Sequence, residues 1–148
     1  MLSVHELKEI LIGDLTEWDV DKEDKLNKGH RAINIILGNL LSGKQNEELI
    51  LEFDARVTKE ALFAYHCDKL ECDLQCKLYD EEGVCDLNNQ EDNSIYRTQI
   101  IQDLLDREKT WSSMWLEYDR CKFAYDPNFE EVLNYIKNNP ISIKTKIK

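Results

Sequence analysis

Residues 5–14 read HELKEILIGD, and this stretch determines how the rest of the chain is interpreted. On a helix, His5 and Glu9 are one turn apart and share a face, with Glu6 beside them. The Gly-Asp pair that follows is typical of a helix that ends with a positive φ, which leaves Asp14 just past the helix end. One imidazole and three carboxylates are therefore expected in one small volume. Divalent metals that polarise phosphates bind through this mixture of nitrogen and oxygen ligands.

Each of these side chains also has a plainer interpretation. His5 alone is compatible with a structural or surface histidine, and Glu6 with a first-turn acid that complements the helix dipole. Glu9 is compatible with a surface acid paired with Lys8, and Asp14 with an ordinary turn residue. We favour a metal site because of the combination of residues rather than because of any one of them.

The apolar residues recur at helical spacing through nearly the whole chain, and Gly and Pro are scarce. Asp21, Thr58 and the Asp126-Pro127 pair are helix-start signals. We predict an all-α fold with helices near residues 7–11, 21–43, 47–53, 58–78, 95–105, 111–123 and 128–136. An acidic loop at 81–93 separates the fourth and fifth of them.

The length of 148 residues is typical of a single domain, and the chain carries a net charge of −11. That charge disfavours binding to a nucleic-acid backbone. The negative charge is compatible with a small phosphorylated substrate, because a bound divalent cation reverses the local electric field. We expect one helical domain over residues 1–148, with a frayed basic tail at 141–148.

The cysteines are odd in number, and their spacing matches no zinc pattern. We interpret them as reduced thiols, with a thiophilic metal on Cys72 and Cys76 as the weaker alternative. No apolar run is long enough to span a membrane, and residues 1–4 are too short for a targeting segment. We therefore expect a cytoplasmic protein without a membrane partner.

The pattern HELKEILIGD resembles the His-Asp-x-x-Glu-x-x-x-x-Gly-Asp signature of HD-domain phosphohydrolases, specifically the 5′-deoxynucleotidase-like branch. Glu6 stands where the family has Asp. Further segments that resemble the family follow in the family's order, at residues 22–25, 31–32, 52–53, 58–61, 68–71, 74–75 and 79. The resemblance thus covers about the first half of the chain and implies an HD-domain-like helical bundle.

The resemblance also implies a function and a set of site residues. It implies hydrolysis of nucleoside 5′-monophosphates or similar small phosphate monoesters, with a divalent metal such as Mn, Co, Mg or Zn. His5, Glu6 and Asp68 correspond to metal ligands of the family. Glu9 corresponds to the catalytic residue that handles the attacking water, and Asp14 to the residue that meets the sugar hydroxyl.

The chain departs from the family in two respects. The family has an additional metal-binding His on an earlier helix, whereas only four residues precede His5 here. This predicts a member shortened at its N-terminus or a fragment, unless another residue has taken over the position. The extra methylene of Glu6 moves its carboxylate by more than about 1 Å. On a helix, His66 points about 200° away from Asp68, so it replaces the missing His only with a local distortion. Both departures predict weakened or lost metal binding.

Two rival functions follow from these departures and from the charge. The first is a catalytically inactive, shortened HD scaffold that acts as a binding or regulatory module, with a possible homodimer through its aromatic C-terminal helices. The second, which rests on the charge alone, is an acidic inhibitor that mimics nucleic acid. We interpret Trp111, Trp115 and Tyr118 as core packing or a dimer face rather than a base-stacking platform. His30 lies in a charged stretch, and we predict that it is exposed.

Overall fold

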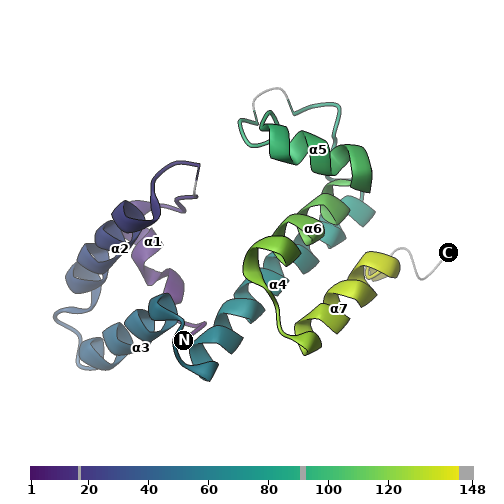
Figure 1. Cartoon of the computed structure of the whole chain (residues 1–148). Helices are drawn as coiled ribbons and strands as arrows, with labels where there is room; N and C mark the ends of the chain where they lie inside the picture. Colours follow the sequence, from purple (N-terminus) through teal and green to yellow (C-terminus); the bar gives the residue numbers. More distant parts are fainter. Residues whose placement is uncertain (17, 91–92, 144–148) are drawn as a thin grey trace. The chain divides into compact units, whose positions relative to one another are not determined.

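The computed structural model describes residues 1–16, 18–90 and 93–143. Seven α-helices and one 3₁₀ helix make up its regular structure, and these described residues contain no strand, which confirms the all-α prediction (Figure 1). The chain divides into two compact units, Met1–Tyr65 and His66–Lys148. The boundary between them falls inside helix α4 (Lys59–Glu81).

The motif forms one short helical segment at the start of the first unit. The 3₁₀ helix η1 (His5–Lys8) runs directly into α1 (Glu9–Ile12). Gly13 follows with a φ of 74°, and its N–H donates to the Glu9 carbonyl at 2.8 Å. The predicted positive-φ end of this helix is therefore confirmed.

Helices α2 (Lys22–Leu37) and α3 (Gly43–Ala55) complete most of the first unit. Asp21 caps α2 as predicted, because its side chain accepts from the Asp24 N–H at 2.8 Å. A buried apolar cluster joins α2, α3 and η1; its members are Ile33, Leu37 and Ile50, with Val4, Leu7 and Ile36 packed against them. This cluster positions the motif segment against the two longer helices.

The predicted continuation of the second helix to Gly43 is wrong. Helix α2 ends at Leu37, and the chain turns there so closely that a β-carbon on Gly43 would collide with the Leu37 carbonyl oxygen. Gly43 instead begins α3, which starts four residues before the predicted 47–53 helix. The glycine was read as a helix end, whereas its lack of a side chain serves a tight approach between two helices.

Helix α4 begins where Thr58 predicts, since the Thr58 hydroxyl accepts from the Ala61 N–H at 3.1 Å. The spacing of Phe63, Cys67, Leu70, Leu74 and Leu78 predicts one buried stripe along this helix, but the Phe63 side chain is 60% exposed. The buried face at this end of the helix carries Ala61, Ala64 and Tyr65 instead. A residue next to a buried position is rotated by about 100° along a helix, which turns Phe63 away from that face.

The second unit contains α5 (Gln99–Glu108), α6 (Trp111–Phe123) and α7 (Pro127–Asn138). Side chains from α4, α6 and α7 share one apolar core, made of Leu116, Tyr125, Phe129, Leu133 and Ile136 with Cys67, Leu70, Leu74 and Phe123 against it. A second cluster joins α5 and α6, and the Trp111, Trp115 and Tyr118 side chains pack against it. The three aromatic side chains are partly buried and contribute to packing within the second unit, while the dimer face stays a prediction.

The starts of α5 and α7 depend on local hydrogen bonds. Helix α5 begins later than predicted, because the Asn93 side chain accepts from the Ile95 and Tyr96 N–H groups at 3.1 Å and holds them in a turn. Helix α7 begins as predicted, with the Asp126 side chain accepting from the Asn128 N–H at 2.8 Å.

Two carboxylates at the end of α4 hold other parts of the second unit. Asp80 accepts from the Ser112 N–H at 3.0 Å and from the Ser112 hydroxyl at 2.6 Å, which joins α4 to the first turn of α6. Glu81 accepts from the Ile141 and Ser142 N–H groups, the latter at 2.7 Å. Part of the expected tail is thus held against α4, and residues 144–148 lie outside the described residues.

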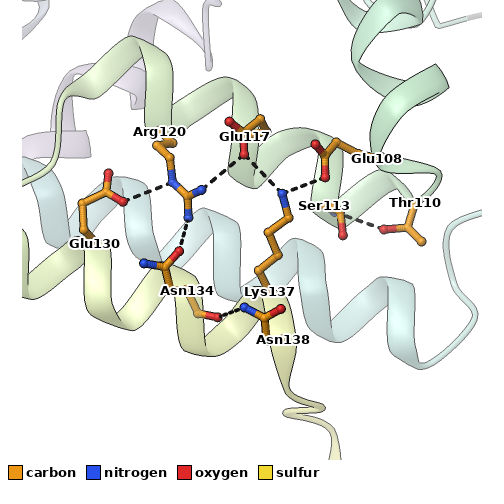
Figure 2. Close-up of polar contacts among 9 residues, drawn as sticks. All are labelled: Glu108, Thr110, Ser113, Glu117, Arg120, Glu130, Asn134, Lys137 and Asn138. Carbon is orange, nitrogen blue, oxygen red and sulfur yellow. Dashed lines mark hydrogen bonds and ion pairs between the residues drawn. The ribbon is translucent and has the colours of Figure 1, made fainter.

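A network of ion pairs joins α6 to α7 and to the end of α5 (Figure 2). Lys137 lies 2.7 Å from Glu108 and 3.2 Å from Glu117, and Arg120 lies 3.1 Å from Glu130 and 3.3 Å from Glu117. Glu117 therefore connects the two cations. The network fixes the packing of α7 along α6.

The five cysteines are free thiols, as predicted. Burial is the main reason that the pKa of the Cys76 thiol is raised to about 12, which makes this thiol unreactive at neutral pH. None of the described helices combines the length and the apolar character that crossing a membrane requires.

Candidate functional site

His5 presents one ring nitrogen in a form that suits a metal. Its Nδ1 lies 2.8 Å from the Leu2 carbonyl oxygen, and a carbonyl can only accept, so the proton resides on Nδ1. Its ring packs against Phe53 with centroids 4.7 Å apart. A histidine held in this way directs the lone pair of Nε2 outward as a metal ligand.

Glu6 lies next to that nitrogen. Its Oε1 is 3.9 Å from His5 Nε2, and its side chain is 70% exposed. The imidazole nitrogen and the carboxylate oxygen are therefore neighbours on the motif segment, and both types of atom bind divalent metals such as Mn, Co and Zn. The donor set of His5 and Glu6 fits such an ion.

Glu9 of the motif has a raised proton affinity. Partial burial raises the pKa of the Glu9 carboxyl, and the negative charges of Asp14 and Glu6 raise it further. Lys25 and Lys8 oppose that shift, but the pKa stays above its ordinary value. A carboxylate with a raised pKa is a stronger base, which suits proton transfer near neutral pH.

Asp14 is exposed beyond the helix end, where Gly13 turns the chain. The segment after it is held by Lys25 of α2, whose ammonium group donates to the Leu15 carbonyl oxygen. Lys25 also faces Glu9 electrostatically, so it is the cation of α2 that belongs to this site. Sequence reasoning did not single it out, although residues 22–25 carried part of the family resemblance.

Lys8 points away from Glu9, contrary to the plainer interpretation of these two residues as a surface pair. Its ammonium nitrogen lies 2.6 Å from the Asp54 Oδ1 of α3. His30 of α2, which we predict to be exposed, lies beside this pair with its side chain 42% exposed. The role of Asp54 could not be predicted from the sequence, because its partner Lys8 is 46 positions away.

Asp68 belongs to the second unit. It lies on α4, with its side chain 16% exposed and its Oδ2 2.9 Å from the Lys69 ammonium group. His66 is buried, and its ring packs on Tyr125 and Phe129 with centroids 5.1 and 5.2 Å apart. The His66 ring is therefore part of the core of the second unit. The expected meeting of Asp68 with His5 and Glu9 stays a prediction.

A buried acid in the second unit was missed by sequence reasoning. Asp73 is 2% exposed, and the Tyr125 hydroxyl donates to its Oδ2 at 3.4 Å. Burial, and then the neighbouring carboxyl of Asp119, raise the pKa of Asp73 to about 8. The signal in the sequence was its position, three residues after Leu70 on the apolar stripe of α4.

Comparisons with known proteins give one matching family and one similar protein. A family model described as "HD domain" matches residues 1–108. The chain is 37% identical over 86 residues to the protein named 5'-deoxynucleotidase HDDC2 from Dictyostelium discoideum. That similarity covers 55% of this chain and 45% of the relative, so the chain spans less than half of the relative's length. No solved structure matches the chain.

Proposed function

This chain belongs to the HD domain family, and from that premise we propose that it is a metal-dependent phosphohydrolase. The proposed substrates are nucleoside 5′-monophosphates or similar small phosphate monoesters. One observation carries the proposal: the motif segment gathers an oriented imidazole and three carboxylates, one of them with a raised pKa, within the first unit. The name of the Dictyostelium relative supports a nucleotide as the substrate.

The proposed metal ligands are His5 Nε2 and the carboxylates of Glu6 and Asp68. Asp68 follows Tyr65, the last residue of the first unit, by three positions on the continuous helix α4. When bound, a divalent ion polarises the phosphoryl group and lowers the pKa of water at the site.

The remaining residues of the motif have proposed roles of their own. Glu9 orients the attacking water and accepts its proton as the new oxygen–phosphorus bond forms, for which its raised pKa is suited. The ester bond between phosphorus and the 5′-oxygen breaks, and the nucleoside leaves with that oxygen protonated from solvent. Asp14 accepts a hydrogen bond from a sugar hydroxyl. Gly13 allows the turn that presents Asp14 beside Glu9. Lys25 keeps that turn against α2 through the Leu15 carbonyl.

One observation favours the inactive-scaffold alternative. Glu6 has a longer side chain than the Asp of the family signature, and its carboxylate is largely in solvent. An exposed, flexible carboxylate binds a metal more weakly than a preorganised one. The two proposals differ in whether added metal produces any turnover.

The test is phosphate release from a panel of nucleoside 5′-monophosphates, with the 3′-monophosphates as controls, in excess Mn²⁺, Co²⁺, Mg²⁺ or Zn²⁺. We expect turnover of the 5′-monophosphates and a loss of about 100-fold or more in kcat for Glu9→Gln, the size typical of general-base removal. Glu48→Gln, an exposed acid of α3, is the matched control. Unchanged activity in Glu9→Gln would exclude the mechanism, and no activity with any metal would favour the inactive scaffold.

A further inference from the structure

Lys8 lies inside the motif, yet its side chain is buried in the first unit. Its ammonium nitrogen is 2.6 Å from Asp54 Oδ1, and both side chains are only 11% exposed. The two residues join η1 to the end of α3. An ion pair this short and this enclosed has a defined direction, unlike an exposed pair such as Lys44–Glu48.

The path of the Lys8 side chain is fixed by a glycine. A β-carbon on Gly29 of α2 would lie 3.1 Å from Lys8 Cδ, so the aliphatic stem of Lys8 crosses α2 where a side chain is absent. Any larger residue at position 29 forces that stem to move. The lysine is thus held along its length as well as at its charged end.

His30 extends this ion pair to a third element. Its Nε2 lies 3.7 Å from Asp54 Oδ2, and both atoms are buried without a hydrogen bond. Asp54 therefore presents one oxygen to η1 and the other to α2. We call Lys8, Asp54 and His30 the anchor network.

The motif segment needs such an anchor because it is short. Residues 5–12 form fewer than three helical turns, and isolated helices of that length are marginal in water. Within this segment Lys8 is buried, while Glu6 is exposed. A rotation that released Lys8 would also turn His5 and Glu9, which flank it on the same segment.

We propose that the anchor network positions the motif: Lys8 and Asp54, with His30, fix the rotation of η1 and α1 and so the directions of His5 and Glu9. These three are positioning residues, and their effect on turnover rests on the proposed function. A buried ion pair contributes little net stability compared with apolar residues of the same shape. Its contribution here is the single orientation that it imposes.

The experiment compares three proteins with the wild type: Asp54→Asn, the double variant Lys8→Met/Asp54→Leu, and the control double variant Asp24→Asn/Lys28→Met. The control removes an exposed ion pair of 2.7 Å within α2 of the same unit. The apolar double variant removes the buried charges together, so it keeps the fold even if Asp54→Asn unfolds. Each protein is measured by thermal unfolding, by amide hydrogen exchange of residues 7–13 and by steady-state kinetics with excess Mn²⁺.

We expect the apolar double variant to melt close to the wild type while its residues 7–13 exchange at least tenfold faster. Its kcat falls at least tenfold with KM within about twofold, and the control variant is unchanged in all three measurements. Wild-type exchange at residues 7–13 in the apolar double variant would overturn the proposal. Hydrogen exchange decides the positioning role even if the wild type proves inactive, an outcome that would count only against the proposed function.

Discussion

The carboxylates of the motif segment and two carboxylates of helix α4 are used in opposite ways. In the first unit, Glu6 and Asp14 are exposed and Glu9 is only half-buried, all on or beside one short helical segment. In the second unit, Asp73 is buried, and Asp80 carries two hydrogen bonds from another helix. Acids that accept no structural hydrogen bond stay available for ligands, whereas acids saturated by protein donors hold the fold. The candidate site therefore lies where carboxylates accept no structural hydrogen bond from the protein.

The strongest test of this comparison is Asp80→Ala. The change removes the acceptor of the Ser112 N–H and hydroxyl groups and leaves the first turn of α6 without its partner. We expect a loss of about 2–3 kcal/mol in the free energy of unfolding, as for hydrogen bonds to a charged group. Urea unfolding measures the loss. Turnover by the folded protein should stay at the wild-type level. A loss of kcat without a matching loss of stability would show that Asp80 also contributes to the site.

Asp73→Asn tests the buried acid by its pH dependence. The pKa of Asp73 is about 8 in the folded protein, against an ordinary value of 3.8, so the folded state holds a proton that the unfolded state has lost. Stability from this group is therefore fully present below about pH 4 and is lost as the pH rises toward 8.

We expect Asp73→Asn to lack this loss, so its stability relative to the wild type increases from pH 5 to pH 9. Thermal unfolding at pH 5 and pH 9 measures the difference. Asp103→Asn, at an exposed acid of α5, is the control. A gap between Asp73→Asn and wild type that does not widen with pH would contradict the buried, protonated state.

Gly13→Ala tests the helix end in the first unit. Gly13 has a φ of 74°, and a β-carbon there would meet no atom within 4 Å, so the cost is one of backbone conformation alone. We expect about 1 kcal/mol of destabilisation. Chemical unfolding checks this value, and a larger fall in kcat than in stability would connect the turn to Asp14. A change in neither quantity would separate the turn from the site.

Lys137→Met has the smallest expected effect. Partial burial lowers the pKa of Lys137, but hydrogen bonds from its ammonium group to Glu108 and Glu117 outweigh burial, and the net pKa is raised (Figure 2). We expect a loss of about 0.5–1 kcal/mol at low salt that shrinks at 1 M salt, because partly exposed ion pairs are screened. Thermal unfolding at both salt concentrations checks it. A loss that does not depend on salt would indicate packing rather than charge.

Local signals in the sequence located most of the fold. Asp21, Thr58 and Asp126 cap helices where they were expected, because a cap depends on residues three positions away. The end of α2 was missed, since Gly43 serves a close approach to Leu37 that no local pattern reveals. Helix boundaries that depend on packing between helices cannot be predicted from the spacing of apolar residues.

The candidate site divides in the same way. The motif predicted His5, Glu9 and Asp14 as one group, because they lie within ten residues of each other on a helix and its end. The pairing of Lys8 with Asp54 joins residues 46 positions apart, and such pairs depend on how helices pack. The approach of Asp68 to the motif depends on packing too, and it remains a prediction.

The close approach of Gly29 to the aliphatic part of the Lys8 side chain limits which substitutions the two positions accept. A β-carbon at position 29 would lie 3.1 Å from Lys8 Cδ, so a side chain there requires the Lys8 stem to shift by a few tenths of an ångström. The two positions should therefore change together across orthologues. Deep mutational scanning should find Gly29 intolerant of single substitutions and rescued by truncation at position 8. Gly29 lies outside the motif in the sequence, yet the residue type at this position limits the path of the Lys8 side chain.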